Sequence, residues 1–368
     1  MNSATARVGD LPVAWRVPLL MLGFVSLLSG ILAGLARLGW AVPLPAPQTL
    51  VLHGPLMISG FFGTVIGLER AVALGRRWAY AGALFSGLGG LSLVIGLPPA
   101  VGAAAMSLGS GVLLAATLVI VGRQRETFTV TLALGAASGL AGNLLWLFGV
   151  APAAVVALWL NFLVLTIAGE RLELSRFLPP SVNARRLFPL IVAVLLVGSL
   201  AVLAGRGVPL YGLGLLALAA WLLRQDIARR TVRERGQTRF IAVCLLSGYL
   251  WLAVGGLILL VAGGFQGRGY DAALHALLLG FVFSMVFGHA PIIFPAVVRV
   301  RMPWQPSAYL PLSVLHASLA VRLAGDALGQ VALIAWGGLL NALALALFIA
   351  VTLASVIRGA RRSRTQAP

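Results

Sequence analysis

The sequence contains no lysine, one cysteine and only nine acidic residues, and each shortage excludes a class of protein. The single Cys244 excludes an intrachain disulfide framework and any metal or redox motif that needs two cysteines. Charged residues make up 10% of the 368 residues and apolar residues 60%, whereas a typical soluble domain is about 25% charged. A soluble chain of this length could not bury so much apolar surface, so a soluble enzyme and a disordered chain are both excluded.

Long apolar segments are what the sequence does contain. A membrane-spanning helix needs about 20 mostly apolar residues. Twelve segments qualify: 14–39, 48–68, 78–97, 99–121, 128–149, 152–169, 187–205, 208–223, 240–264, 271–298, 307–325 and 331–357. The sequence therefore predicts an all-α integral membrane protein with twelve transmembrane helices, embedded in a lipid bilayer. We expect one membrane domain over residues 1–368, with a cytoplasmic loop at 224–239 and a basic cytoplasmic tail at 358–368.

The basic residues predict the orientation of these helices. All 27 are arginine, and the net charge is +18. If both termini are cytoplasmic, 23 arginines fall on the cytoplasmic side, and the four others on the outside are Arg37, Arg206, Arg268 and Arg322. Such an imbalance is the positive-inside pattern of a bacterial cytoplasmic (inner) membrane protein. The charge is thus explained by topology, and we expect no nucleic-acid partner.

The four histidines lie in apolar segments, where an ionisable side chain usually marks a functional site. The alternative is that each imidazole only hydrogen-bonds to a neighbouring helix. His53 and His275 each follow the outer start of a segment by four or five residues, which places them roughly 6–8 Å into the bilayer. His289 and His316 fall near the middle or in the inner half. The histidines therefore form two pairs of matched depth.

The spacing of the histidines suits haem or metal ligands. His275 and His289 are fourteen residues apart on one predicted helix; at about 100° per residue they share a face, roughly 21 Å apart along the axis. A bis-histidine haem takes one imidazole from each of two facing helices, and neutral imidazole also binds copper and zinc. His53 and His275 therefore predict a low-spin haem near the outer face. For His289 and His316, a metal ion, a single-histidine haem and plain hydrogen bonding fit equally well.

Two segments resemble a known family. Residues 53–58 read His-Gly-Pro-Leu-Met-Ile, with Phe-Phe-Gly at 61–63, and resemble the second helix of haem–copper oxidase subunit I, which carries an axial ligand of the low-spin haem. Residues 275–281 read His-Ala-Leu-Leu-Leu-Gly-Phe and are similar to the tenth helix, which supplies the other axial histidine. They are also the second and tenth of the twelve segments in this chain.

The His-Ala-Leu pattern, the arginines after the tenth segment and the modest length look more like the NnrS family, a group of twelve-span proteins similar to these oxidases. The resemblance implies haem b, with a second haem or copper deeper in the membrane. It implies a role with nitric oxide or another diatomic gas, or in electron transfer, with a redox protein or a quinone as partner. It also implies three four-helix units in a pseudo-threefold arrangement. Catalysis stays open; an enzyme of this kind would be an oxidoreductase acting on nitric oxide.

The chain departs from the oxidases in two places. Two residues before His275, where the oxidases carry the ligand of the high-spin haem, this chain has Ala273. The sixth and seventh segments, which hold the copper-binding histidines of the oxidases, contain no histidine. We therefore expect no oxygen-reducing centre in its usual place, and a second site would be built differently, from His289 and His316.

Several charged residues near the predicted helix ends have two readings each. Arg268 and Arg322 would pair with the propionates of a shallow haem; alternatively, they are surface arginines whose charged ends reach water. Asp271, one turn before His275, either accepts a hydrogen bond from that imidazole or caps its helix, and the sequence favours the cap. Glu170 and Arg171, at an inner helix end, form either an interfacial ion pair, which the sequence favours, or a proton entry point.

A cofactor-free transporter is the alternative class of function. The membrane histidines would then handle protons or a substrate. The sequence argues against it, because no predicted span carries a buried acid and few spans contain helix-breaking signals.

Overall fold

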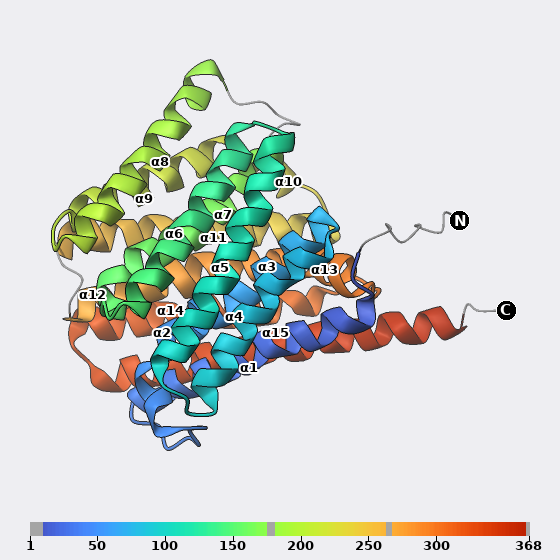
Figure 1. The fold of residues 1–368 in the computed structure, drawn as a ribbon, viewed down its shortest axis with the longest axis horizontal. Coiled ribbons are helices and arrows are strands. Elements are labelled where there is room, and N and C mark those ends of the chain that lie inside the picture. Colours follow the sequence, from blue (N-terminus) through green and yellow to red (C-terminus); the bar gives the residue numbers. More distant parts are fainter. Residues whose placement is uncertain (1–9, 175–180, 263–266, 366–368) are drawn as a thin grey trace. The chain divides into compact units, whose positions relative to one another are not determined.

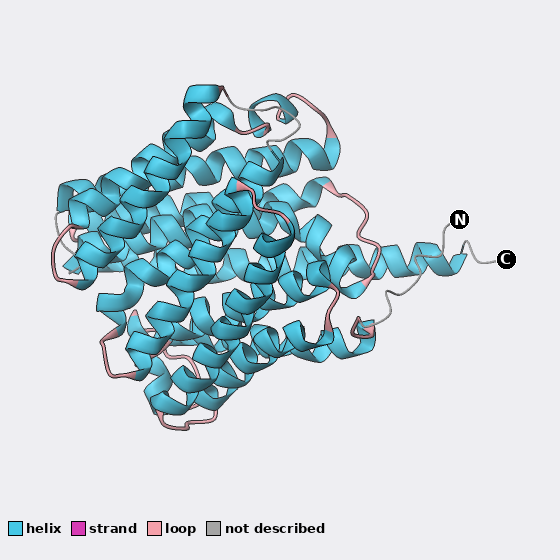
Figure 2. Cartoon of the chain, turned by 45° about the horizontal axis from the view of Figure 1, so that its top comes forward, coloured by secondary structure: helices cyan, strands magenta, loops and turns pink. Residues whose placement is uncertain are grey.

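The computed structural model describes residues 10–174, 181–262 and 267–365. Over these ranges all regular structure is helical and no strand occurs, as Figures 1 and 2 show. The prediction of an all-α protein is therefore confirmed. Two of the arginines used to orient the helices, Arg7 and Arg176, lie outside the described residues.

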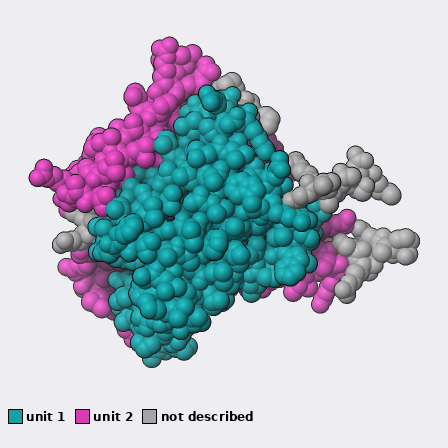
Figure 3. Space-filling view, viewed as in Figure 1, with its two compact units in different colours: residues 1–37, 41–162, 296–299 teal, residues 38–40, 163–295, 300–368 magenta. Residues whose placement is uncertain are grey.

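The chain divides into two compact units, which Figure 3 colours separately. Unit 1 comprises residues 1–37, 41–162 and 296–299, and unit 2 comprises residues 38–40, 163–295 and 300–368. The expectations of one membrane domain and of three four-helix units stay predictions.

Unit 1 is built on the N-terminal helices. They are α1 (Val13–Arg37), the 3-10 turn η1 (Pro47–Val51), α2 (His53–Pro55), the π-helical segment η2 (Leu56–Phe62), α3 (Gly63–Leu74), the turn η3 (Arg77–Ala79), α4 (Tyr80–Val94), α5 (Pro99–Arg123), α6 (Thr127–Leu147) and the first part of α7 (Pro152–Leu174). Helix α4 packs on α1, α3 and α5, and α5 packs on α6. The start of α6 is fixed by a capping box between Glu126 and Thr129.

Unit 2 contains the remaining helices. They are the end of α7, α8 (Val182–Leu203), α9 (Val208–Gln225), α10 (Ala228–Thr231), α11 (Gly236–Ala262), α12 (Gly267–His275), the π-helical segment η5 (Ala276–Phe283), most of α13 (Ser284–Val298), the turn η6 (Pro306–Ala308), α14 (Tyr309–Leu328) and α15 (Val331–Thr365). Helix α11 lies between α9 on one side and α12 and η5 on the other, and α14 packs on α12, η5 and α15. Gly212 and Gly256 let α9 and α11 meet backbone to backbone, the close approach that small residues allow in membranes.

Each of the twelve predicted segments coincides with a helix, and 11 of these helices are long and apolar enough to cross a bilayer. The other is α4, whose 15 residues are fewer than a typical span needs. Many large apolar side chains point outward, among them Trp15, Met21 and Leu250, as expected where lipid is the solvent. The bacterial inner membrane and the cytoplasmic termini stay predictions.

The structure also differs from the expected segments in detail. The tenth segment is not a uniform α-helix but three pieces, α12, η5 and α13. The expected loop at 224–239 contains the short helix α10 and a buried acid, Asp226. The expected tail at 358–368 continues helix α15 as far as Thr365.

Candidate functional site

His53 lies against a glycine face of α1 within unit 1. Its Nδ1 atom is 2.7 Å from the carbonyl oxygen of Gly30, and a Cβ atom added at Gly34 would lie 3.1 Å from the ring. Because a carbonyl oxygen only accepts hydrogen bonds, Nδ1 carries the proton and Nε2 carries the lone pair. The ring is thus oriented in the tautomer in which Nε2 can bind a metal.

His275 is held in the same tautomer within unit 2. Its Nδ1 donates to the carbonyl oxygen of Asp271 at 2.8 Å, and the Asp271 carboxylate lies 3.4 Å away. That carboxylate accepts a hydrogen bond of 2.7 Å from Arg322. Since α12 begins at Gly267, Asp271 lies inside the helix. The favoured cap is therefore wrong. The imidazole proton goes to the backbone carbonyl of Asp271, whereas the Asp271 carboxylate binds Arg322.

Each of the two histidines, His53 and His275, lies next to a π-helical segment. His53 opens the single turn α2 before η2, and His275 is the last residue of α12 before η5. π-Helical turns are rare and occur frequently at functional sites.

The segment η5 also changes the angle about the helix axis between His275 and His289. The shared face was calculated for a continuous α-helix, and i→i+5 hydrogen bonds wind the chain by fewer degrees per residue, so that calculation does not hold.

Arg322 and Asp326 are two buried charged residues on α14. They are one helical turn apart and only 6% and 7% exposed. Among the described residues, Arg322 Nε and Asp326 Oδ2 have no hydrogen-bond partner. The expectation that no span carries a buried acid was therefore wrong: the predicted span ended at residue 325, whereas α14 continues to Leu328.

Arg268 is exposed, and its guanidinium lies beside Gly329 at the end of α14. The pairing of Arg268 and Arg322 with propionates stays a prediction.

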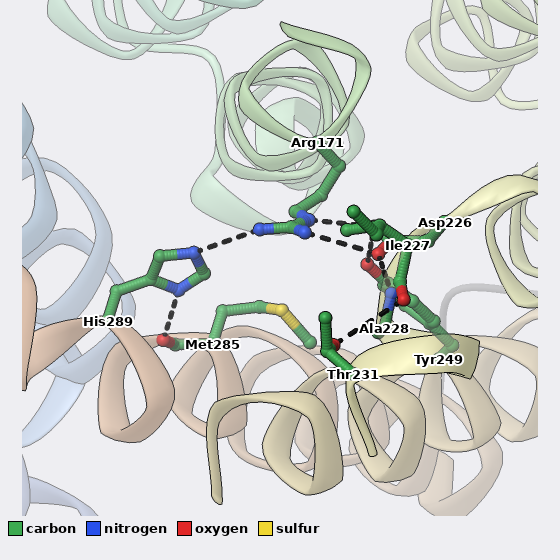
Figure 4. A network of polar contacts seen from close by, with 8 residues as sticks. All are labelled: Arg171, Asp226, Ile227, Ala228, Thr231, Tyr249, Met285 and His289. Atoms are coloured by element: carbon green, nitrogen blue, oxygen red, sulfur yellow. Dashed lines mark hydrogen bonds and ion pairs between the residues drawn. The ribbon is translucent and has the colours of Figure 1, made fainter. Parts of the chain in front are cut away.

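His289 belongs to a buried polar network in unit 2, in which the Arg171 guanidinium lies between the His289 ring and the Asp226 carboxylate (Figure 4). Arg171 Nε donates to Asp226 Oδ2 at 2.7 Å, and Arg171 Nη2 donates to Asp226 Oδ1 at 3.1 Å. Tyr249 donates to Oδ2 at 2.7 Å. On the other side of the guanidinium, Arg171 Nη1 is 3.5 Å from His289 Nε2. His289 Nδ1 is 2.7 Å from the carbonyl oxygen of Met285.

Local chain geometry positions Asp226. It ends α9 and accepts a hydrogen bond of 2.7 Å from the backbone N–H of Ala228, the first residue of α10. This is the turn that aspartate favours at a helix start. Arg171 and Asp226 are each 4% exposed, so their ion pair is buried rather than interfacial. The sequence had placed Asp226 in a hydrophilic loop. Tyr249 and Asp226 were missed because neither belongs to a motif.

His316 uses both ring nitrogens in hydrogen bonds within unit 2. Nδ1 accepts from the indole N–H of Trp251 at 2.9 Å. Nε2 is 3.0 Å from the Ser247 hydroxyl, whose own proton is directed to the backbone of α11. In the part of the chain that the structure describes, no group of three His, Cys, Asp or Glu side chains could hold a metal ion. His289 and His316 both make hydrogen bonds, and a metal ion or a single-histidine haem at these residues stays a prediction.

We expect His316→Ala to lower the stability of the protein without changing its metal content. The substitution leaves the part-buried Trp251 N–H without its acceptor, and an unsatisfied donor costs up to about 1–3 kcal/mol. Thermal unfolding in detergent measures the first effect and elemental analysis the second. His316→Gln is the control, because its amide can donate and accept. Loss of bound copper or haem from His316→Ala at unchanged stability would contradict this assignment.

The comparisons with known proteins place the chain in a family without supplying a function. No curated protein and no solved structure matches it. The resemblance to NnrS therefore stays a prediction. A family model described as "Domain of unknown function (DUF8744)" matches residues 16–357, nearly the whole chain. The chain belongs to this family, the DUF8744 domain family.

Proposed function

We propose that this protein binds haem b in the membrane, with Nε2 of His53 and of His275 as axial ligands. One observation carries the proposal: each imidazole donates from Nδ1 to a backbone carbonyl, at 2.7 and 2.8 Å, and so presents Nε2 as the lone-pair atom. Iron-binding histidines are fixed in this way by a hydrogen bond from the other ring nitrogen.

The surroundings of each histidine fit a haem ligand. In unit 1, Gly30 and Gly34 provide a surface without side chains against which the His53 ring lies. In unit 2, the backbone carbonyl of Asp271 accepts from His275, and the Asp271 carboxylate, 3.4 Å from the same ring nitrogen, is bound by the buried Arg322. A hydrogen bond from the other ring nitrogen fixes the orientation of a ligand imidazole. Haem would supply one-electron chemistry; the chain supplies oriented nitrogen ligands and, at Arg322, a buried positive charge near the second of them.

Electron transfer is the activity that two axial histidines favour. A haem held by both His53 and His275 would supply one-electron transfer rather than gas binding. We therefore propose electron transfer as the role of this haem. Reaction with nitric oxide, and an oxidoreductase activity based on it, would need a second site or the release of one histidine.

A visible spectrum of the purified protein tests the proposal. Expressed with adequate haem supply, the wild-type protein should show the sharp α band of reduced b-type haem. His53→Ala and His275→Ala should each lose the low-spin signal, whereas His316→Gln should keep it. If both histidines bind one iron, either substitution removes the whole signal. A colourless wild-type protein would refute the proposal.

Cofactor-free transport is a second candidate, and the buried acids favour it. Asp226 and Asp326 are both buried ionisable groups of the kind that mark ion and proton pathways in membranes. Asp226 is connected through Arg171 to His289, a group able to carry a proton. A colourless protein that moves protons in vesicles, and loses this activity in Asp326→Asn, would establish this alternative.

A further inference from the structure

One end of the helices in unit 2 carries a group of exposed arginines. Helices α8 and α9 lie side by side and are joined by a short turn (Figure 1), so the start of α8 lies beside the end of α9. The helix α10 and the turn that leads to α11 follow at the same end. We call this group the arginine surface; its members, all exposed, are Arg185, Arg186, Arg224, Arg229, Arg230 and Arg233.

Hydrogen bonds join the three helices that carry most of these arginines. The indole N–H of Trp221 on α9 donates to the carbonyl oxygen of Ala184 on α8 at 2.9 Å. Arg185 follows Ala184 directly, and Arg224 lies about one turn beyond Trp221. Arg229 Nη1, on α10, donates to the carbonyl oxygen of Arg224 at 2.7 Å. The arginines of α8, α9 and α10 therefore belong to one surface.

The backbone beneath the arginine surface is held in place. The Asp226 carboxylate accepts from the N–H of Ala228 at 2.7 Å and is itself bound by the buried Arg171. Ala228 is fully buried and α10 packs on α11, so the exposed Arg229 and Arg230 face outward. Side chains on an ordered backbone lose less freedom when a ligand binds, which favours affinity.

The positive charge of this surface is not balanced within the part of the chain that the structure describes. From α8 to the start of α11 the only acids are Asp226, which is buried and paired with Arg171, and the exposed Glu234. None of the six guanidinium groups makes an ion pair with a described residue. Like charges this close repel one another, and an anion among them would relieve that repulsion.

Exposed apolar side chains continue from the arginine surface along α8. Leu187 and Leu190 are 49% and 62% exposed. Leu190 lies one turn beyond Arg186 and therefore on the same face of the helix. Since α8 is long and apolar enough to cross a bilayer, the leucines lie closer to its middle than the arginines do. The surface thus suits a ligand with an anionic head and an apolar tail.

We propose that the arginine surface binds the head group of an anionic phospholipid, with an acyl chain along Leu187 and Leu190. Guanidinium groups form paired hydrogen bonds with phosphate oxygens. Clusters of about four to eight basic side chains next to a membrane helix are typical of anionic lipid sites. A soluble acidic polypeptide would leave the two leucines uncovered. The site goes beyond the proposed function, because it does not depend on haem.

Lipid binding is measured by native mass spectrometry as phosphatidylglycerol, or the net-neutral phosphatidylcholine, is added to the full-length protein in detergent. Phosphatidylglycerol should bind at least roughly tenfold more tightly, because each basic side chain near an anionic lipid contributes about fivefold. The triple variant Arg185→Gln, Arg186→Gln and Arg224→Gln should lose this preference. The single variant Arg186→Gln, which alters one exposed side chain, should weaken phosphatidylglycerol binding about fivefold and decides the test if the triple variant fails to fold.

The matched control removes the same charge elsewhere on the protein. Arg76, Arg77 and Arg125 are exposed arginines of unit 1, and the predicted topology places them on the same side of the membrane. Changing these three to glutamine should leave the binding of phosphatidylglycerol unchanged. An equal loss in the two triple variants, or no preference for phosphatidylglycerol in the wild type, would overturn the proposal, because any exposed arginine would then serve.

Two competitors distinguish a lipid from other anions. Neither inorganic phosphate nor polyglutamate should displace phosphatidylglycerol when added at the concentration of the lipid. Displacement by phosphate would indicate a site for the free ion, and displacement by polyglutamate a surface for an acidic protein; either result would overturn the proposal.

The outcome is independent of the haem proposal. The doubly substituted protein His53→Ala with His275→Ala should bind phosphatidylglycerol as the wild type does. A colourless protein that prefers this lipid would refute only the haem proposal, and a haem protein without the preference would refute only this one.

Discussion

Asp226→Ala is expected to lower the free energy of unfolding by about 3–5 kcal/mol, the usual result of removing one partner from a buried ion pair. The substitution leaves the Arg171 guanidinium at 4% exposure without its carboxylate. It also removes the acceptor of the Tyr249 hydroxyl and of the Ala228 N–H. Arg171→Met should cost a comparable amount, because it leaves the carboxylate buried instead.

The double variant gives the sharper test. If the charges interact directly, Asp226→Ala combined with Arg171→Met should be less destabilised than the sum of the two single changes, because no unpaired charge remains. Thermal unfolding in detergent gives the three values. Glu234→Ala is the control: this glutamate is exposed, and we expect a change within about 0.5 kcal/mol. Additive effects, or a loss below about 1 kcal/mol for Asp226→Ala, would show that this pair does not stabilise the fold.

Gly280→Val is expected to destabilise unit 2 by about 3 kcal/mol, the upper part of the range for overpacked sites. A Cβ atom on Gly280 would lie 2.5 Å from Trp251 Cβ and 2.8 Å from Trp251 Cδ2. The Trp251 side chain would therefore have to move, and its hydrogen bond to His316 would break. Gly280 is also five residues after His275 within η5, so we expect the haem content to fall as well.

Thermal unfolding and the haem spectrum, recorded on the same preparation, check this result. Gly111→Ala is the matched control, because a Cβ there meets nothing within 4 Å and alanine favours a helix over glycine by about 1 kcal/mol. A Gly280→Val protein with wild-type stability and spectrum would show that Trp251 moves aside without cost.

The sequence predicted the helices well because hydropathy over about 20 residues is a local property. It failed where an element departs from uniform α-helix. Nothing in the apolar run at 276–283 distinguishes a π-helical turn from an α-helical one, so η5 was missed and the faces of His275 and His289 were assigned on the wrong periodicity. The end of α14 was placed too early, which hid Asp326 from the search for buried acids.

The sequence by itself determined the class of this protein, its helical spans and the few polar side chains inside them, since composition and hydropathy suffice for these. Only the tertiary structure decided what those side chains contact. Arg171 meets Asp226 across 55 residues and His289 across 118, and His316 meets Trp251 across 65. Such contacts depend on how distant helices pack, and no local pattern records that packing; the tautomer of His53, which donates to Gly30 on α1, follows from it.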